Sequence, residues 1–111
     1  MKMNLRQAAL CLGFVICLPA MAAGDAAQFE SGKALFLQNA VPACALCHTL
    51  ADADASGAVG PVLDDLKPDA QRVAKALRDG IGQMPSYAGS LSEAQIQALA
   101  HYVSKASGGA K

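Results

Sequence analysis

Apolar residues recur at a spacing of three to four in three segments of the chain, which is the period of an amphipathic helix. The first segment has its apolar positions on one face: Phe29, Gly32, Leu35 and Phe36. This pattern predicts a helix over residues 26–38, with Asp25 as the N-cap and Gln28 as its capping-box partner. A glycine inside a helix costs roughly 1 kcal/mol relative to alanine. Gly32 therefore indicates close packing against another helix.

Two more helices follow. Pro68 at a first helical position and Gly80 at a C-terminal position delimit a helix over 68–79. Its apolar face consists of Val73, Ala74, Ala76 and Leu77. Ser92, with Gln95 three residues later, is a capping box that starts the last helix, which frays at Ser107. The buried stripe of this helix is expected to be Ile96, Leu99, Tyr102 and Val103.

The segments between these helices are long for so short a chain. Residues 51–59 are small and polar without periodicity, and residues 81–90 are punctuated by glycine and proline. No strand pattern is visible. Long loops without secondary structure are uncommon in a compact domain unless they serve a function. The pattern predicts a small all-α domain of three to four helices whose loops are wrapped around a ligand.

The N-terminal residues have a different character. Lys2 and Arg6 precede an apolar run of about 11 residues, and small residues follow it at 20–23. This order is typical of a secretory signal peptide, and the run is shorter than the ~20 residues of a membrane-spanning helix. We expect residues 1–23 to be a signal peptide cleaved near Ala22 or Ala23. Residues 24–111 would then be one domain, exported to the periplasm without a stable membrane anchor.

Cleavage at this point changes the composition. The chain has four cysteines and four methionines, but only Cys44, Cys47 and Met84 lie beyond residue 23. The remaining chain, with seven basic and nine acidic residues, lacks the basic surface that a nucleic-acid partner requires. At about 88 residues it would bury only a limited core. A domain of this size often depends on a metal or another cross-link for stability.

Cys44, Cys47 and His48 have the spacing C-x-x-C-H, which is typical of covalent haem attachment. Two cysteines three positions apart can reach two neighbouring vinyl groups of a porphyrin, and the adjacent histidine then lies under the iron. Met84 is the expected second axial ligand, because it lies in a loop beside Pro85 and not on a helical stripe. His/Met ligation is the pattern of cytochromes c. His101 is the alternative ligand, but its place in the last helix favours the solvent side.

Two other interpretations of the motif have less support. A thiol–disulfide motif should follow a strand, and a structural zinc site needs four ligands, for which the chain lacks donors. Three functional classes stay open: an electron carrier, a haem enzyme or sensor with a labile Met84, and a thiol-redox or metal module without haem. We expect Tyr87 to be a packing residue, and Lys33 and Lys75 to be ordinary surface charges. The acidic residues Asp52, Asp54, Asp64 and Asp65 are expected to form a solvated loop face, with a docking patch as the alternative.

Residues 29–105 resemble the class I monohaem cytochromes c of bacteria. Gly32, Phe36 and Tyr102 match the positions at which the first and last helices of that family cross. The resemblance implies a small cytochrome c-like fold around one haem c, attached through Cys44 and Cys47 and bound by His48. Pro61 and Leu63 match a turn in which the proline carbonyl orients the histidine ring and the leucine packs on the porphyrin.

Residues 57–87 look similar, more closely, to the cytochrome subunit of bacterial sulfite dehydrogenases, particularly over 64–69 and 84–87. That resemblance implies a subunit that accepts electrons from a molybdenum subunit and passes them to another cytochrome or an oxidase. A free-standing cytochrome c that shuttles electrons to a terminal oxidase is the alternative. In either case we expect an electron-transfer protein and not an enzyme, since both axial positions of the iron would be filled.

Overall fold

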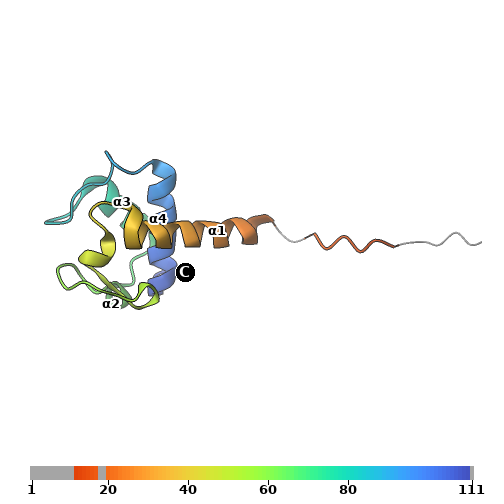
Figure 1. The fold of residues 1–111 in the computed structure, drawn as a ribbon, viewed down its shortest axis with the longest axis horizontal. Helices are drawn as coiled ribbons and strands as arrows, with labels where there is room; N and C mark the ends of the chain where they lie inside the picture. Colours follow the sequence, from red (N-terminus) through yellow and green to blue (C-terminus); the bar gives the residue numbers. More distant parts are fainter. Residues whose placement is uncertain (1–11, 18–19, 111) are drawn as a thin grey trace, which may run out of the picture.

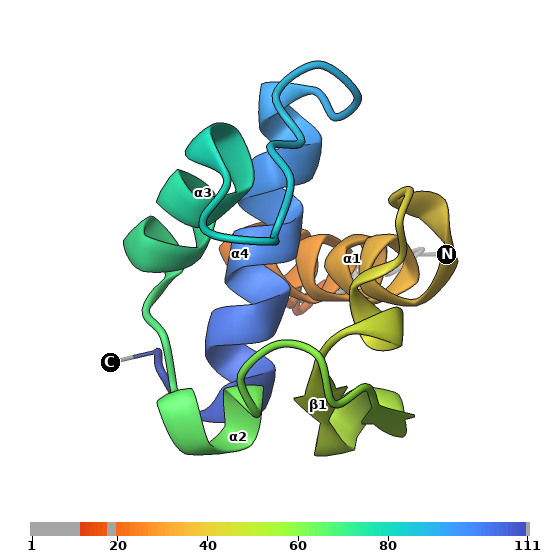
Figure 2. The ribbon, with the colours of Figure 1, turned by 90° about the vertical axis from the view of Figure 1, so that its left-hand side faces the viewer.

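The computed structural model describes residues 12–17 and 20–110, and it describes the side chains of residues 12–17 and 24–110. Its helices are α1 (Ala20–Ala34), α2 (Leu63–Leu66), α3 (Ala70–Asp79) and α4 (Glu93–Ser107). Figure 1 shows α1 lying across α4, with an extended segment leading away from the start of α1, and Figure 2 shows α3 on the opposite side of α4 from α1. Most of the expected signal peptide lies outside the described residues. No helix within the described residues is long and apolar enough to cross a membrane.

The first helix begins earlier than expected. It starts at Ala20, so Asp25 lies inside it and is not an N-cap, and the prediction of a capping box with Gln28 is wrong. Alanine is the best helix former, and the alanines around residues 20–27 extend the helix beyond Asp25 toward the N-terminus. At its other end α1 widens into a π-helical turn, Leu35–Asn39, which ends where Ala40 N donates to Leu35 O at 3.1 Å.

The crossing of α1 and α4 is the centre of the core. A Cβ at Gly32 would overlap with Ala98 O and would lie 2.5 Å from Tyr102 Cβ, so only glycine allows the two backbones to approach this closely. Phe29 and Phe36 both pack edge-on against Tyr102, with ring centroids 4.9 and 5.8 Å away. Tyr102, Phe36 and Leu99 are almost completely buried. The close approach predicted from Gly32 is therefore confirmed.

The ends of α3 and α4 follow the sequence signals with one shift. Asp69, not Pro68, precedes α3, because its carboxylate accepts a hydrogen bond from Arg72 N at 2.8 Å. Gly80 ends α3 with a φ of 71°. The capping box of α4 is present in both directions: Ser92 N donates to Gln95 Oε1 at 2.8 Å, and Gln95 N donates to Ser92 Oγ at 3.2 Å. The predicted apolar stripe of α4 is buried.

The expectation that residues 51–59 form an irregular loop is wrong in part. Strands β1 (Thr49–Leu50) and β2 (Ala55–Ser56) pair antiparallel, and a 3-10 turn, Ala51–Ala53, joins them. Leu50 is fully buried, and Asp54 takes a left-handed conformation with a φ of 48°. Strands of two residues are too short to show an alternating pattern, which is why the sequence did not reveal them.

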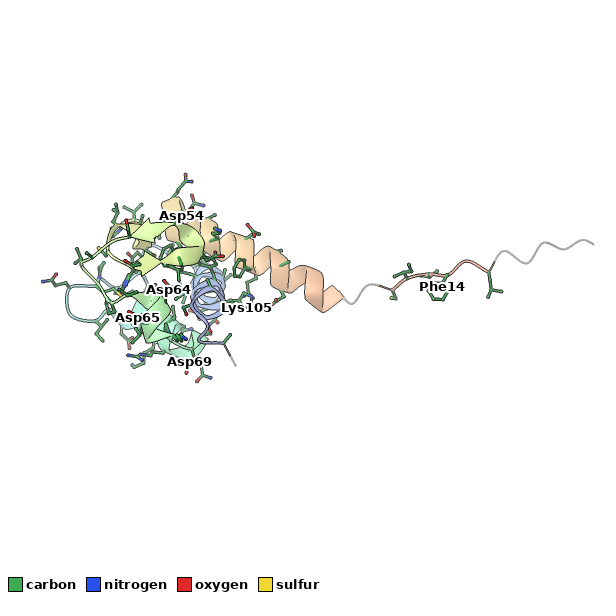
Figure 3. The ribbon with its side chains drawn as sticks, turned by 90° about the horizontal axis from the view of Figure 1, so that it is seen from below. Phe14, Asp54, Asp64, Asp65, Asp69 and Lys105 are labelled. Carbon is green, nitrogen blue, oxygen red and sulfur yellow. The ribbon has the colours of Figure 1, made fainter. Side chains whose placement is uncertain are left out.

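Two members of the expected acidic loop face have structural partners. Asp52 Oδ2 accepts the Tyr102 hydroxyl at 2.7 Å and lies 3.2 Å from Lys33 Nζ, so Lys33 is not an ordinary surface charge. Asp64 Oδ2 accepts from Ala51 N at 2.9 Å. Asp54 and Asp65 are exposed, and Figure 3 shows both on the face seen from below, far from Phe14 on the extended segment. Lys75 forms an exposed ion pair with Asp79.

Asp52 makes the stability of the fold dependent on pH. The Tyr102 hydroxyl, and after it Lys33, hold the pKa of Asp52 below its usual range despite some desolvation. A carboxylate whose pKa is lower in the folded state stabilises the fold above its unfolded pKa, and this contribution is lost as the pH falls through the folded pKa. Asp52→Asn should therefore flatten the decline in unfolding free energy below about pH 4, measured by denaturant titration between pH 7 and 3.

Asp54→Asn is the matched control, because it removes one charge from the same β1–β2 hairpin. Position 54 is exposed, and asparagine tolerates its left-handed conformation. If the unfolding free energy of Asp52→Asn declined with falling pH as steeply as that of the wild-type protein, Asp52 would not be the source of the pH dependence.

Candidate haem-binding site

The motif residues lie on a tight turn between α1 and β1. Cys44–Leu46 is a single 3-10 turn, in which Cys47 N and His48 N both donate to Cys44 O, at 3.1 and 3.0 Å. The turn brings two half-buried thiols and the imidazole to adjacent positions on a short piece of backbone. Burial raises the pKa of Cys44 to about 11. A reactive dithiol needs a lowered thiol pKa, so this environment does not favour thiol-redox chemistry.

The His48 ring is oriented by the loop that precedes α2. Its Nδ1 donates to Pro61 O at 2.8 Å. Because the carbonyl can only accept, Nδ1 carries the proton, and Nε2 is left with the free lone pair that a metal requires. Such a bond also makes the imidazole a more basic ligand.

Two glycines make this arrangement possible, and the sequence alone did not reveal their role. A Cβ at Gly60 would lie 2.5 Å from His48 Cε1 and 2.9 Å from its Nδ1. A Cβ at Gly57 would lie 2.6–2.7 Å from the backbone of Cys47 and His48. Gly60 N also donates to Cys47 O at 2.7 Å. The loop therefore packs directly on the motif. In the sequence, only the Gly60-Pro61 pair indicates this close contact.

Met84 lies on a small turn after α3. Met84 N donates to Ile81 O at 2.9 Å and Ile81 N donates to Met84 O at 3.0 Å, while Gly82 between them has a φ of 55°. The Met84 side chain is half-buried and packs against the core. Gly80 lets the chain reverse, because a Cβ there would lie 2.9 Å from Met84 O. In Figure 2 this loop (cyan) passes in front of α4, on the side where the yellow turn at 44–46 and the green loop before α2 are also seen.

Tyr87 joins the Met84 loop to the segment before the motif. Its ring is 4% exposed, and its hydroxyl donates to Pro42 O at 2.7 Å. Burial raises its pKa to about 12. The hydroxyl therefore stays protonated at neutral pH and keeps its role as a donor. Tyr87 is a packing residue, as the sequence predicts, and also a hydrogen-bonded one.

The surroundings of the motif suit a large apolar group. Leu63 is buried in the core at the start of α2. Exposed apolar side chains lie on the motif, on the Met84 turn and on the loop that packs against the motif: Leu46, Ile81, Val59 and Val62. Two thiols, an imidazole with a free Nε2 and a loop methionine, set among apolar residues, are the donors that a covalent haem uses. The residues present therefore fit the group.

The alternative ligand and the alternative metal are not favoured. His101 does not face solvent as expected: its side chain is 21% exposed, and its Nε2 lies 3.0 Å from Asp25 Oδ1. Asp25 Oδ2 also accepts from Lys105 Nζ at 2.6 Å, so this cluster joins α4 to the first half of α1. Across the part of the chain that the structure describes, no three His, Cys, Asp or Glu residues are grouped to hold a metal ion.

Comparison with known proteins defines the class. A family model described as cytochrome C oxidase, cbb3-type, subunit III, matches residues 27–103. The crystal structure of the c-type cytochrome SorU from Sinorhizobium meliloti is similar, with a TM-score of 0.72 and 51% sequence identity over 78% of this chain and 98% of that chain. No curated protein matches the chain.

The family match covers most of the chain, so the chain belongs to this family of c-type cytochromes. It is a monohaem class I cytochrome that binds one haem c covalently, and Cys44 and Cys47 have the spacing for the attachment. It is accordingly an electron-transfer protein and not an enzyme.

Proposed function

We propose that this chain is a periplasmic electron-transfer protein in which His48 and Met84 are the two axial ligands of the haem iron. Residues 1–23 would be removed on export, and residues 24–111 would form the mature domain. The observation that carries the proposal is the 2.8 Å hydrogen bond from His48 Nδ1 to Pro61 O, because it leaves Nε2 free for a metal. The turn that carries Met84 supports the second half of the assignment.

The ligand pair determines what the site can do. Haem c supplies one-electron reduction and oxidation of its iron, and a thioether ligand favours the ferrous form and raises the potential. With both His48 and Met84 bound to the iron, no coordination position would be left for a substrate. The chain's own contribution is then to hold both ligands in place, so that little has to move when an electron is transferred.

We further propose that the electron donor is the molybdenum subunit of a sulfite dehydrogenase. The support is the resemblance of residues 64–69 and 84–87 to the cytochrome subunit of those enzymes. The exposed Leu46 and Ile81 lie on the segments that carry the motif and Met84, and the exposed Val59 lies on the loop that packs against the motif. Such residues suit the small interfaces of electron-transfer partners. A terminal oxidase or another cytochrome would then receive the electron.

Rapid mixing tests the partner. The ferric holoprotein is mixed with a bacterial sulfite dehydrogenase that retains its molybdenum centre but lacks its own cytochrome subunit. We expect the reduced α and β bands to appear when sulfite is present and to stay absent when it is omitted. A holoprotein that stays ferric with sulfite, but is rapidly oxidised by a terminal oxidase after chemical reduction, would contradict the sulfite assignment and favour the shuttle.

A further inference from the structure

The Met84 turn is tied to the rest of the domain mainly from one side. The backbone hydrogen bonds of Met84 go to Ile81 within the turn. After the turn, Ser86 Oγ donates to Arg78 O at 2.5 Å and Tyr87 N donates to Leu77 O at 2.7 Å. Both acceptors belong to α3. These bonds hold the loop against α3 but do not hold it toward the cysteine motif.

The Tyr87 hydroxyl connects the Met84 loop to the segment before the cysteine motif. Its 2.7 Å bond to Pro42 O spans 45 positions of sequence and ends two residues before Cys44. Among the hydrogen bonds of the described residues, it alone joins residues 81–90 to residues 41–48. Packing fixes the ring, which is 4% exposed, so the direction of the hydroxyl is set by the core.

We propose that the Tyr87 hydroxyl is a positioning group for Met84, in that its bond to the Pro42 carbonyl limits how often the loop opens and the thioether leaves the iron. The inference rests on the proposed His48/Met84 ligation and adds to it a residue that touches neither the iron nor Met84. A competing ligand can bind only when the loop is open. Its apparent dissociation constant is therefore inversely proportional to the open fraction.

Imidazole is the probe, titrated into the ferric holoprotein and followed by the visible spectrum. Tyr87→Phe keeps the buried ring and removes only the hydroxyl. The usual net strength of one hydrogen bond corresponds to an apparent dissociation constant that falls about threefold to tenfold. The rate of imidazole binding should rise by a similar factor if loop opening limits it.

Tyr102→Phe is the matched control. It removes the same atom from a buried tyrosine whose hydroxyl donates to Asp52 at 2.7 Å, a bond that does not involve the 81–90 loop. We expect its imidazole affinity to stay within twofold of wild type. If the affinity for imidazole rose equally in both variants, the cause would be a general loss of stability, and the proposal would be overturned. An unchanged affinity in Tyr87→Phe would overturn it as well.

Met84→Ala separates this proposal from the one on which it rests. If Met84→Ala binds imidazole more tightly than wild type but Tyr87→Phe does not, the ligand assignment stands and the positioning role fails. If the wild-type protein already binds imidazole as tightly as Met84→Ala, both fail.

Discussion

Met84→Ala is expected to lower the reduction potential of the holoprotein by on the order of 0.1 V, a modest part of the ~0.8 V over which axial ligands tune haem. The thioether stabilises ferrous iron, and water or no ligand in its place does not. The reduced variant should also bind carbon monoxide readily, whereas the wild-type protein should resist it. Spectroelectrochemical titration measures the potential, and the reduced spectrum under carbon monoxide measures the open position.

The matched control for Met84→Ala is His101→Ala, which removes the other donor that the sequence offered. His101 lies against Asp25 in the first half of α1, so its loss should leave both the potential and the carbon monoxide resistance unchanged. If His101→Ala opened the iron and Met84→Ala did not, the ligand assignment would be reversed.

Gly60→Ala is expected to destabilise the holoprotein by about 2–4 kcal/mol. The new methyl carbon would lie 2.5 Å from His48 Cε1, so either the ring or the loop must move. Overpacking of this kind costs about 1–3 kcal/mol, and the loss of the bond from Nδ1 to Pro61 O adds about 1 kcal/mol. This is a large part of the total stability of a small domain. Guanidinium unfolding, followed by haem absorbance and by helical circular dichroism, gives the difference.

Gly89→Ala is the control for Gly60→Ala, because a Cβ at Gly89 meets nothing within 4 Å and its backbone is not left-handed. It should change the unfolding free energy by less than about 0.5 kcal/mol. A similarly small change for Gly60→Ala would mean that the loop does not press on the His48 ring.

Sequence features that act within a few residues predicted most of the helices well. The capping box at Ser92 and the glycine at residue 80 mark helix ends because they satisfy backbone groups within a few residues. Gly32 indicated the helix crossing because a glycine in a helix interior needs a compensating contact. The C-x-x-C-H spacing and the single methionine beyond residue 23 indicated the donors.

Features that depend on residues far apart in the chain could not be predicted in the same way. The Tyr102 hydroxyl donates to Asp52, which lies 50 positions away in the sequence. This bond gives a structural role to a carboxylate that the sequence assigns to a solvated loop face. The tie from Tyr87 to Pro42 spans 45 positions. The start of α1 lies earlier than the sequence predicts, because Asp25 has the local features of an N-cap but its carboxylate pairs with Lys105 of α4 in the fold. Only the packed structure decides between such uses of one side chain.

The most direct test of the central claim is the weak absorption of the ferric holoprotein that comes from sulfur ligation of the iron. His/Met ligation predicts that the band is present in the wild-type protein and in His101→Ala and disappears in Met84→Ala. A band that persists in Met84→Ala, or is missing from the wild-type protein, would contradict the account.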